Sequence, residues 1–568
     1  MSETVKILFG LFGGLAIFIF GMNMMSECLQ KAAGGKMKKI LSMLTKNPLL
    51  GVCAGALATA VLQSSSATTV MAIGFVSAGL MNLSQAISII LGANIGTTMT
   101  AQIIAFKITD YIYLFIAAGF LIAFVSKKEK IKSIGQTLFA FGLLFEGIEI
   151  MGGVMKPLAA SPFFTQLISQ VAGIPVLGVL VGTLMTLVVQ SSSATIAVLQ
   201  NFAAQPALDG TSSIIGLAGA IPILLGDNIG TTITALLASV GQGKDARRTA
   251  VAHSVFNISG AVLFLFFVEP YAKIIQFISP KGAEIDVISR QIANAHTGFN
   301  ITMTCIWLPM IAVLVKIVMY LIPDKKEDYI PAPGAAKYLD EKLINQPVAA
   351  QYLVSKEVIR CGKMVEGMLQ KVYGLSEAKE QLILNEIIQD GYAVENLYQN
   401  INNYLNAMFA EGVMTEEQAG ESTRLMYVLC DIYRMGMRCK EITEAMVGRK
   451  EEGIHLSKEA TKDLKKSVKM IHDMYEYAMD VMISGDSSAI KNVQKKKDEV
   501  LLLDDKMRQA HVDRVGKKKC SVKLTALFNS ILHDIDRMGN SCVNLVDMAT
   551  SGEGIRLLLK EGDHAAEA

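Results

Sequence analysis

The sequence predicts an all-α protein: a polytopic membrane domain with inverted repeats and two re-entrant hairpins, followed by a soluble helical bundle. Its 568 residues are 51% hydrophobic and only 18% charged, whereas a soluble domain carries about 25% charged residues. Residues 1–322 contain 19 basic and 12 acidic side chains, whereas residues 323–568 contain 34 and 39. The chain therefore has a membrane-like part and a soluble-like part.

Seven apolar stretches of the first part are predicted to cross the bilayer, which takes about 20 helical residues. Two further stretches, 48–80 and 175–205, are too long for one crossing and too short for two. Each has a polar cluster at its middle, and irregular backbone survives at membrane depth only where it lines a cavity or is buried in protein. We therefore expect two re-entrant hairpins with polar tips. The predicted spans are 5–25, 85–106, 110–126, 133–155, 213–240, 250–268 and 296–322.

An internal repeat is the strongest feature of this part. Residues 48–69 align without gaps on 175–196, with 14 of 22 positions identical. A second motif, Gly-x-Asn-Ile-Gly-Thr-Thr, also occurs twice, so the repeat units run near 10–106 and 131–240. An odd number of spans separates the two units, which makes the second unit inverted in the membrane. Inverted repeats with a midplane site are typical of secondary transporters.

Clusters of basic residues set the topology. With both hairpins re-entrant, all four clusters fall on one face, which the positive-inside rule makes cytoplasmic. We therefore predict a multi-pass cell membrane protein with its N-terminus outside and its charged C-terminal domain in the cytoplasm. We expect no cleaved secretory signal, because no small-residue cleavage site follows the first apolar stretch. The clusters lie at 31–46, 127–132, 244–248 and 325–326.

The C-terminal part begins after a Pro-rich linker at 323–334. Residues 335–568 show long helical patterns and no convincing strand. This part also repeats, because 429–439 align with 532–542 at 7 of 11 positions around a shared Asp-Ile-x-Arg-Met-Gly string. We expect two helical halves that pack as a pseudo-symmetric bundle.

The tips of the two hairpins carry the same string, Gln-Ser-Ser-Ser-Ala-Thr. The Gln amide and the Ser hydroxyls both donate and accept hydrogen bonds, and the start of a helix frees N–H groups that attract anions. Two facing tips would enclose a tetrahedral oxyanion with neutral donors. For one copy, helix packing through small residues is the simpler explanation, but two copies favour a binding site. The candidate residues are Gln63, Ser64, Ser65, Ser66, Gln190, Ser191, Ser192 and Ser193.

The second duplicated motif supplies amide, hydroxyl and carbonyl oxygens, which are the hard ligands that a small cation such as Na⁺ would use. Its paired glycines permit tight backbone turns. Asp227 stands where the first copy has Ala93, and a carboxylate buried in a span marks an ion or proton path. The alternative for Asp227 is a carboxylate at a helix end or at the membrane interface. The candidate sodium residues are Asn94, Thr97, Thr98, Asp227, Asn228, Thr231 and Thr232.

A third duplicated pattern, Ala-His-[Ser/Thr]-x-Phe-Asn, contains His253 and His296. These histidines would either relay protons or form a polar clamp between helices, and we favour the clamp.

Several function classes lack their motifs. The sequence has no GxxxxGK[ST] loop, no GxSxG elbow and no HExxH, so we expect neither an enzyme nor an ATP-driven pump. The eight cysteines form no CxxC pair, and a net charge of +2 does not support nucleic-acid binding. We expect no cofactor and no metal site, and coupling to an ion gradient is the remaining energy source.

These duplicated motifs resemble those of the type II sodium/phosphate cotransporter family, and the soluble part resembles a PhoU domain at 431–436 and 534–539. The resemblance covers nearly the whole chain. It implies sodium-coupled movement of inorganic phosphate, with the two Gln-Ser-Ser-Ser strings at the phosphate and the Gly-x-Asn-Ile-Gly-Thr-Thr residues at the sodium ions. PhoU domains can bind metals through Glu/Asp-xxx-Asp patterns. Glu386 and Asp390 fit once, but Gln494 stands where the second copy needs a carboxylate.

The expected mechanism is alternating access around a midplane site in the lipid bilayer. Three alternatives stay open. The protein could be a phosphate-sensing regulator that acts through its PhoU-like domain on a cytoplasmic partner or a second copy. It could also move another oxyanion, or use H⁺ in place of Na⁺. The same motifs fit import and export.

Overall fold

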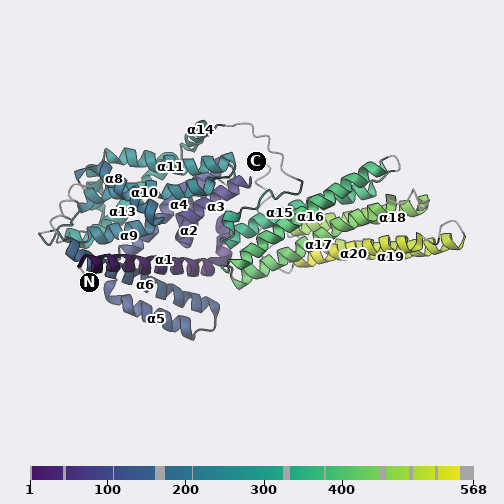
Figure 1. The fold of residues 1–568 in the computed structure, drawn as a ribbon, viewed down its shortest axis with the longest axis horizontal. Coiled ribbons are helices and arrows are strands. Elements are labelled where there is room, and N and C mark those ends of the chain that lie inside the picture. The colour runs from purple at the N-terminus through teal and green to yellow at the C-terminus, as the bar shows by residue number, and fades with distance from the viewer. Residues whose placement is uncertain are drawn as a thin grey trace. The chain divides into compact units, whose positions relative to one another are not determined.

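The computed structural model of the chain is helical, and the described residues contain no β-strand (Figure 1). The prediction of an all-α fold is confirmed. The chain divides into two compact units, Met1–Lys325 and Lys326–Ala568. The structure describes residues 3–42, 47–106, 108–159, 173–207, 209–323, 333–376, 379–447, 456–484, 490–517, 522 and 524–550.

Most of the predicted linker at 323–334 lies outside these residues, as do the side chains of the basic clusters at 31–46 and 325–326. The predicted membrane orientation therefore stays a prediction.

The first unit is built from helices of unequal length. In Figure 1, α5 and α6 lie side by side, and α6 also packs along α1. The elements are α1 (Glu3–Ser42), α2 (Pro48–Leu62), α3 (Ser65–Ser77), α4 (Leu83–Ile104), η1 (Thr109–Tyr111), α5 (Ile112–Val125), α6 (Glu129–Ala159), α8 (Pro175–Val189), α9 (Ser192–Ala203), α10 (Gly216–Ser239), α11 (Lys244–Leu265), α12 (Val268–Ile278), α13 (Glu284–Trp307) and α14 (Ile311–Leu321).

Five of the described helices are long and apolar enough to cross a membrane. A sixth candidate is the pair α13 and α14, which is bent by 86°. The span predicted at 296–322 is therefore broken into two helices in the structure. Pro309 sits at the bend, where a proline cannot donate the helical hydrogen bond and clashes with the preceding turn. The predicted span at 110–126 contains α5, whose 14 residues extend about 21 Å, less than the roughly 30 Å of a bilayer core.

The glycines of the second motif do not form turns, which corrects the expectation from the sequence. Gly92 lies inside α4 and Gly226 lies inside α10. A Cβ atom on Gly92 would overlap the carbonyl oxygen of Val52 in α2, and one on Gly226 would overlap that of Val179 in α8. The glycines thus let α2 approach α4, and α8 approach α10, at backbone distance. Both repeats use the same contact.

The second unit consists of two three-helix halves. α15, α16 and α17 pack together, as do α18, α19 and α20, and the halves meet through the pairs α15–α18 and α17–α20. A continuous apolar core runs through both halves and includes the fully buried Tyr475 and Phe528. The elements are η2 (Glu341–Leu343), α15 (Pro347–Tyr373), α16 (Glu380–Ala410), α17 (Glu416–Val447), α18 (Lys458–Ser484), α19 (Ile490–Gly516) and α20 (Leu524–Thr550).

The repeated Asp-Ile-x-Arg-Met-Gly strings lie on α17 and α20, where the halves meet. Asp431 accepts hydrogen bonds from Ser541 at 3.1 Å and from Asn544 at 3.3 Å. At the equivalent place, Asp534 lies 3.9 Å from Arg438. Each aspartate therefore joins its half of the bundle to the other half.

The residues that fit the Glu/Asp-xxx-Asp pattern, for which we expected no metal, take part in ion pairs. Glu386 and Asp390 lie 3.1 Å and 2.7 Å from the Lys371 ammonium group. Among the described residues, no group of three or more His, Cys, Asp or Glu side chains is placed to hold a metal ion.

Candidate functional site

Each predicted polar tip interrupts a helix at one glutamine. Gln63 separates α2 from α3 with a φ of 49°, and Gln190 separates α8 from α9 with a φ of 56°. They are the only non-glycine residues with positive φ in the described part of the chain. This left-handed conformation costs an L-residue about 1–2 kcal/mol, whereas glycine adopts it freely. A glutamine at both places therefore indicates that its side chain is needed.

The serines of the two tips divide into three kinds. Ser64 and Ser191 are helix N-caps, whose hydroxyl oxygens accept from the backbone N–H groups of Ala67 and Ala194 at 3.2 and 3.3 Å. The Ser66 hydroxyl lies 3.1 Å from the hydroxyl of Thr234 in α10. Within the described residues, the remaining hydroxyls have no hydrogen-bond partner and stay available to a ligand. These are Ser65, Ser192 and Ser193.

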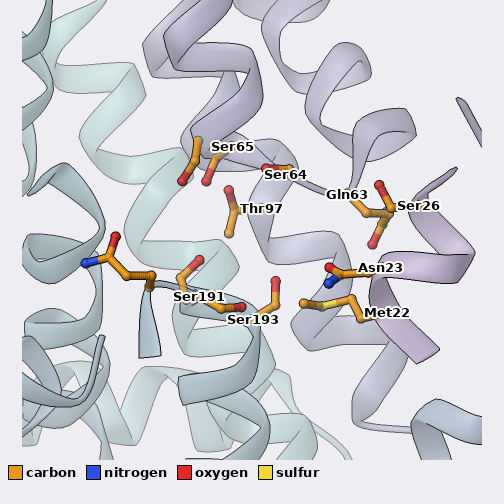
Figure 2. Close-up of a pocket in the computed structure, with 12 residues that line it drawn as sticks. Met22, Asn23, Ser26, Gln63, Ser64, Ser65, Thr97, Ser191 and Ser193 are labelled. Atoms are coloured by element: carbon orange, nitrogen blue, oxygen red, sulfur yellow. The ribbon is translucent and has the colours of Figure 1, made fainter. Parts of the chain in front are cut away.

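The two tips line one cavity of about 170 Å³, although they lie 127 residues apart in the sequence. This volume is more than ten times the about 15 Å³ that one water requires. In Figure 2, Ser64 and Ser65 lie on one side of the cavity, Ser191 and Ser193 on the other, and Thr97 between them. The lining residues are Met22, Asn23, Ser26, Gln63, Ser64, Ser65, Ser66, Thr97, Gln190, Ser191, Ser192 and Ser193.

No residue of this lining carries a charge. Amide and hydroxyl groups can donate to an oxyanion without holding it as tightly as Lys or Arg would. All eight residues predicted at the tips belong to the lining. α1 contributes three further lining residues that the duplicated motifs did not predict, namely Met22, Asn23 and Ser26. The signal available for Asn23 was a polar side chain inside an apolar span.

The candidate sodium residues are not gathered at this cavity. Thr97 lines it, whereas Asn94 and Asn228 are buried elsewhere in α4 and α10. The hydroxyls of Thr98, Thr231 and Thr232 donate to carbonyl groups of their own helices at 2.7 to 2.9 Å. These threonines would have to redirect their hydroxyls to offer a proton elsewhere, although each oxygen keeps lone pairs for a cation.

Asp227 is the exception, because its carboxylate is incompletely paired. The residue has no exposed surface. Its Oδ1 accepts from the Thr186 hydroxyl at 2.6 Å, and its buried Oδ2 has no partner among the described residues. A buried carboxylate oxygen without a partner is costly, so this position suits a cation or a proton. The first repeat has Ala93 here and cannot offer the same group.

The two histidines contact the asparagines of the second motif. His253 Nε2 lies 3.1 Å from Asn94 Oδ1, and His296 Nε2 lies 3.2 Å from Asn228 Oδ1. Both histidines are buried. α11 is thereby tied to α4 and α13 to α10, which is the polar contact between helices that we favoured.

The apolar helices, with a neutral polar cavity between two duplicated helix breaks, are the architecture of a helical membrane protein. The Na⁺/Pi-cotransporter family matches residues 17–153 and 155–320, and the PhoU domain matches residues 358–446. The chain belongs to the Na⁺/Pi-cotransporter family and carries a C-terminal PhoU domain, as its motifs suggested.

Similar proteins occur in bacteria and animals. The chain is 34% identical to YqeW of Bacillus subtilis, an uncharacterized protein, over 50% of this chain and 87% of YqeW. It is 24% identical to "Putative inorganic phosphate export protein YjbB" of Salmonella typhimurium over 93% of this chain and 95% of YjbB. It is 41% identical to human "Sodium-dependent phosphate transport protein 2B", over 17% of this chain and 14% of that protein. No solved structure matches.

Proposed function

We propose that this protein carries inorganic phosphate across the cell membrane together with Na⁺, and that phosphate binds in the cavity between the two Gln-Ser-Ser-Ser strings. The observation that carries the proposal is the meeting of two distant, identical strings around one neutral cavity. The hydroxyls of Ser65, Ser192 and Ser193 line this cavity and would donate hydrogen bonds to phosphate. The N-terminal ends of α3 and α9 attract anions.

The neutral lining supports coupling to a cation. An anion buried without a compensating charge is costly, and the lining offers none. Co-bound Na⁺ would supply that charge, with Asp227 as its principal protein ligand and with Asn94, Asn228 and the neighbouring threonines as neutral ligands. The name of the human relative, which states sodium dependence, favours Na⁺ over H⁺.

Alternating access would follow from the two repeats, each of which carries one tip and one Gly-x-Asn-Ile-Gly-Thr-Thr helix. In this proposal the N-terminus lies outside and the PhoU domain lies in the cytoplasm. The direction we propose is export, because the YjbB relatives share nearly the full length of this chain and are named for export. An outward phosphate gradient would have to drive this export, since an inward Na⁺ gradient drives co-transported phosphate inward.

A second role is favoured by the PhoU match at residues 358–446. We propose that this domain regulates transport by docking a cytoplasmic partner or a second copy of the chain. The corresponding alternative function is a phosphate sensor, which would bind phosphate without moving it.

The test is radiolabelled phosphate flux in liposomes that contain the full-length protein. An imposed Na⁺ gradient is compared with an equal K⁺ gradient, for the parent and for the Gln63→Ala/Gln190→Ala variant. The matched control replaces two exposed glutamines of the C-terminal unit, Gln381 and Gln509, by alanine.

Flux that requires Na⁺, disappears in the cavity variant and persists in the control would support the proposal. Flux that survives in a well-folded cavity variant would contradict the assignment of the site. Phosphate binding without flux in either direction would replace the transporter by the sensor.

A further inference from the structure

Two threonines at equivalent positions of the repeats make unequal hydrogen bonds. Thr100 in α4 corresponds to Thr234 in α10, because the second motifs align with an offset of 134 residues. The Thr100 hydroxyl donates to Oε1 of Gln63, the tip glutamine of its own repeat, at 2.9 Å. The Thr234 hydroxyl lies 3.1 Å from the Ser66 hydroxyl, which belongs to the tip of the other repeat.

The symmetry-related bonds are not made among the described residues. Gln190 would correspond to Gln63, but its side chain makes only the bond from Nε2 to the Leu187 carbonyl at 2.7 Å, and it is exposed. Ser193 would correspond to Ser66, but its hydroxyl has no partner and lines the cavity. Two tips of identical sequence therefore stand in different hydrogen-bonded states. The first tip is engaged by both threonines and the second tip by neither.

The chemistry of a hydroxyl permits these roles to be exchanged. Thr234 donates its proton to the carbonyl of Thr231 at 2.9 Å, which leaves a lone pair for Ser66. Thr100 instead gives its proton to Gln63. If the two threonines swapped roles, the number of hydrogen bonds would stay the same. Each such bond contributes only about 1 kcal/mol net, so the two arrangements lie close in free energy.

We propose that Thr100 and Thr234 are paired positioning residues that exchange partners when the transporter changes the side to which its cavity opens. In the opposite state, Thr234 donates to Gln190 Oε1 and Ser193 donates to Thr100, while Gln63 and Ser66 are released. This inference rests on the proposed alternating access. The threonines act through the tip residues and do not line the cavity themselves.

The test reads which side of the membrane reaches the cavity, and it needs no phosphate flux. Asn23, which lines the cavity, is changed to cysteine in the full-length protein in oriented vesicles. Membrane-impermeant maleimide is added from one face or the other. Labelling at position 23 is read by mass spectrometry, so that the native cysteines do not interfere, and the ratio of the two rates is the observable.

Ser66→Ala removes a bond that exists only in the state described here, and Ser193→Ala removes a bond that exists only in the opposite state. We expect the two variants to shift the labelling ratio in opposite directions, each by about fivefold for a bond of about 1 kcal/mol. The Ser66→Ala/Ser193→Ala double variant should return the ratio to that of the parent. Single variants that shift the ratio in the same direction, or not at all, would overturn the inference.

Thr100→Val separates an exchanging residue from a static one. If the threonines exchange partners, Thr100→Val removes one hydrogen bond from each state, so the labelling ratio stays within about twofold of the parent. Thr100→Ser should behave as the parent does. A static bond to Gln63 would make Thr100→Val shift the ratio as Ser66→Ala does, which would refute the exchange. Accessibility that alternates in a protein without phosphate flux would retain this inference and refute the proposed substrate. Phosphate flux with an unchanged labelling ratio in all variants would retain the proposed substrate and refute the exchange of partners.

Discussion

Replacing Gln63 by glycine and, separately, by alanine distinguishes what its side chain does from what its backbone does. Gln63 has a φ of 49°, which costs an L-residue about 1–2 kcal/mol. Glycine removes that strain and adds about 0.5–1 kcal/mol of conformational entropy cost. Both variants lose the hydrogen bonds of the amide, but only Gln63→Ala keeps the backbone strain. We therefore expect the free energy of unfolding of Gln63→Gly to exceed that of Gln63→Ala by up to about 1 kcal/mol.

Both variants lose the same amide group. Its Nε2 donates to the Ala60 carbonyl at 2.5 Å, and its Oε1 accepts from Thr100 at 2.9 Å. The second N–H of the amide has no protein partner among the described residues and is free to donate to phosphate. A hydrogen bond to a charged group contributes about 1.5–3 kcal/mol, and about 1.4 kcal/mol corresponds to tenfold in affinity. Phosphate affinity should therefore fall by at least about tenfold in both.

The assay is phosphate binding to purified full-length protein by isothermal titration in NaCl, together with thermal unfolding of the same samples. Phosphate affinity should fall equally in the two variants, and the glycine variant should unfold at the higher temperature. Phosphate affinity that survives in Gln63→Gly would refute the contact between this side chain and phosphate. A glycine variant less stable than the alanine variant would refute the argument from backbone strain.

Three further predictions concern packing and the C-terminal unit. Gly55→Ala should lower the free energy of unfolding by about 1–3 kcal/mol, because the new Cβ would overlap the Ile89 carbonyl oxygen. Gly13→Ala should not lower it, because a Cβ there meets nothing within 4 Å. Thermal unfolding of the two variants tests the difference. Burial raises the pKa of the Cys361 thiol from 9.0 to about 12, so the folded protein should resist alkylation there at pH 8, and its stability should decline as the pH rises above 9 because the unfolded thiol ionises first. Peptide mapping after iodoacetamide treatment, with partly exposed Cys430 as the comparison, checks this. Alkylation of Cys361 as fast as that of Cys430 would contradict it. Asp431→Ala should lower the free energy of unfolding by about 1.5–3 kcal/mol, because Ser541 and Asn544 lose their acceptor. Urea unfolding measures this loss against Asp505→Ala, a change at an exposed aspartate. Equal unfolding midpoints would mean that Asp431 does not join the two halves.

The duplicated motifs made the helical class and the shared cavity predictable, because identical strings at a fixed offset point to equivalent places in two repeats. The signal for the bend between α13 and α14 was also in the sequence, since Pro309 interrupts an otherwise apolar run. We misread the glycines of the second motif as turn formers. Their Gly-x-x-x-Gly spacing, present at Gly92 and Gly96, is equally typical of close helix packing.

Other features depend on tertiary contacts that no local pattern contains. The side of α1 that carries Asn23 meets the tips only because α1 packs against α2 and α9. The unequal bonds of Thr100 and Thr234 could not be predicted either, because their sequence contexts are nearly the same. Sequence symmetry sets which residues are equivalent, whereas the difference between the two tips is seen only in the hydrogen bonds of the folded chain.

The charge difference between the repeats leads to the sharpest test of sodium binding. Asp227 bonds to Thr186, and the equivalent residues of the first repeat are Ala93 and Thr59. Asp227→Asn should raise the Na⁺ concentration for half-maximal flux by at least about tenfold, because a charged ligand is lost. In Asp227→Ala/Ala93→Asp the carboxylate moves to the other repeat, where Thr59 can donate to it.

If the carboxylate only has to be near the cavity, the transposed variant should regain Na⁺ dependence relative to Asp227→Ala. If the ion must stay with the second repeat while the tips exchange partners, flux should remain low although the variant elutes as a folded protein. We expect the second result, because the residues that form the hydrogen bonds of the tips occur in both repeats, whereas the buried carboxylate occurs in one. Recovery of sodium-dependent flux by transposition would contradict that division between the repeats.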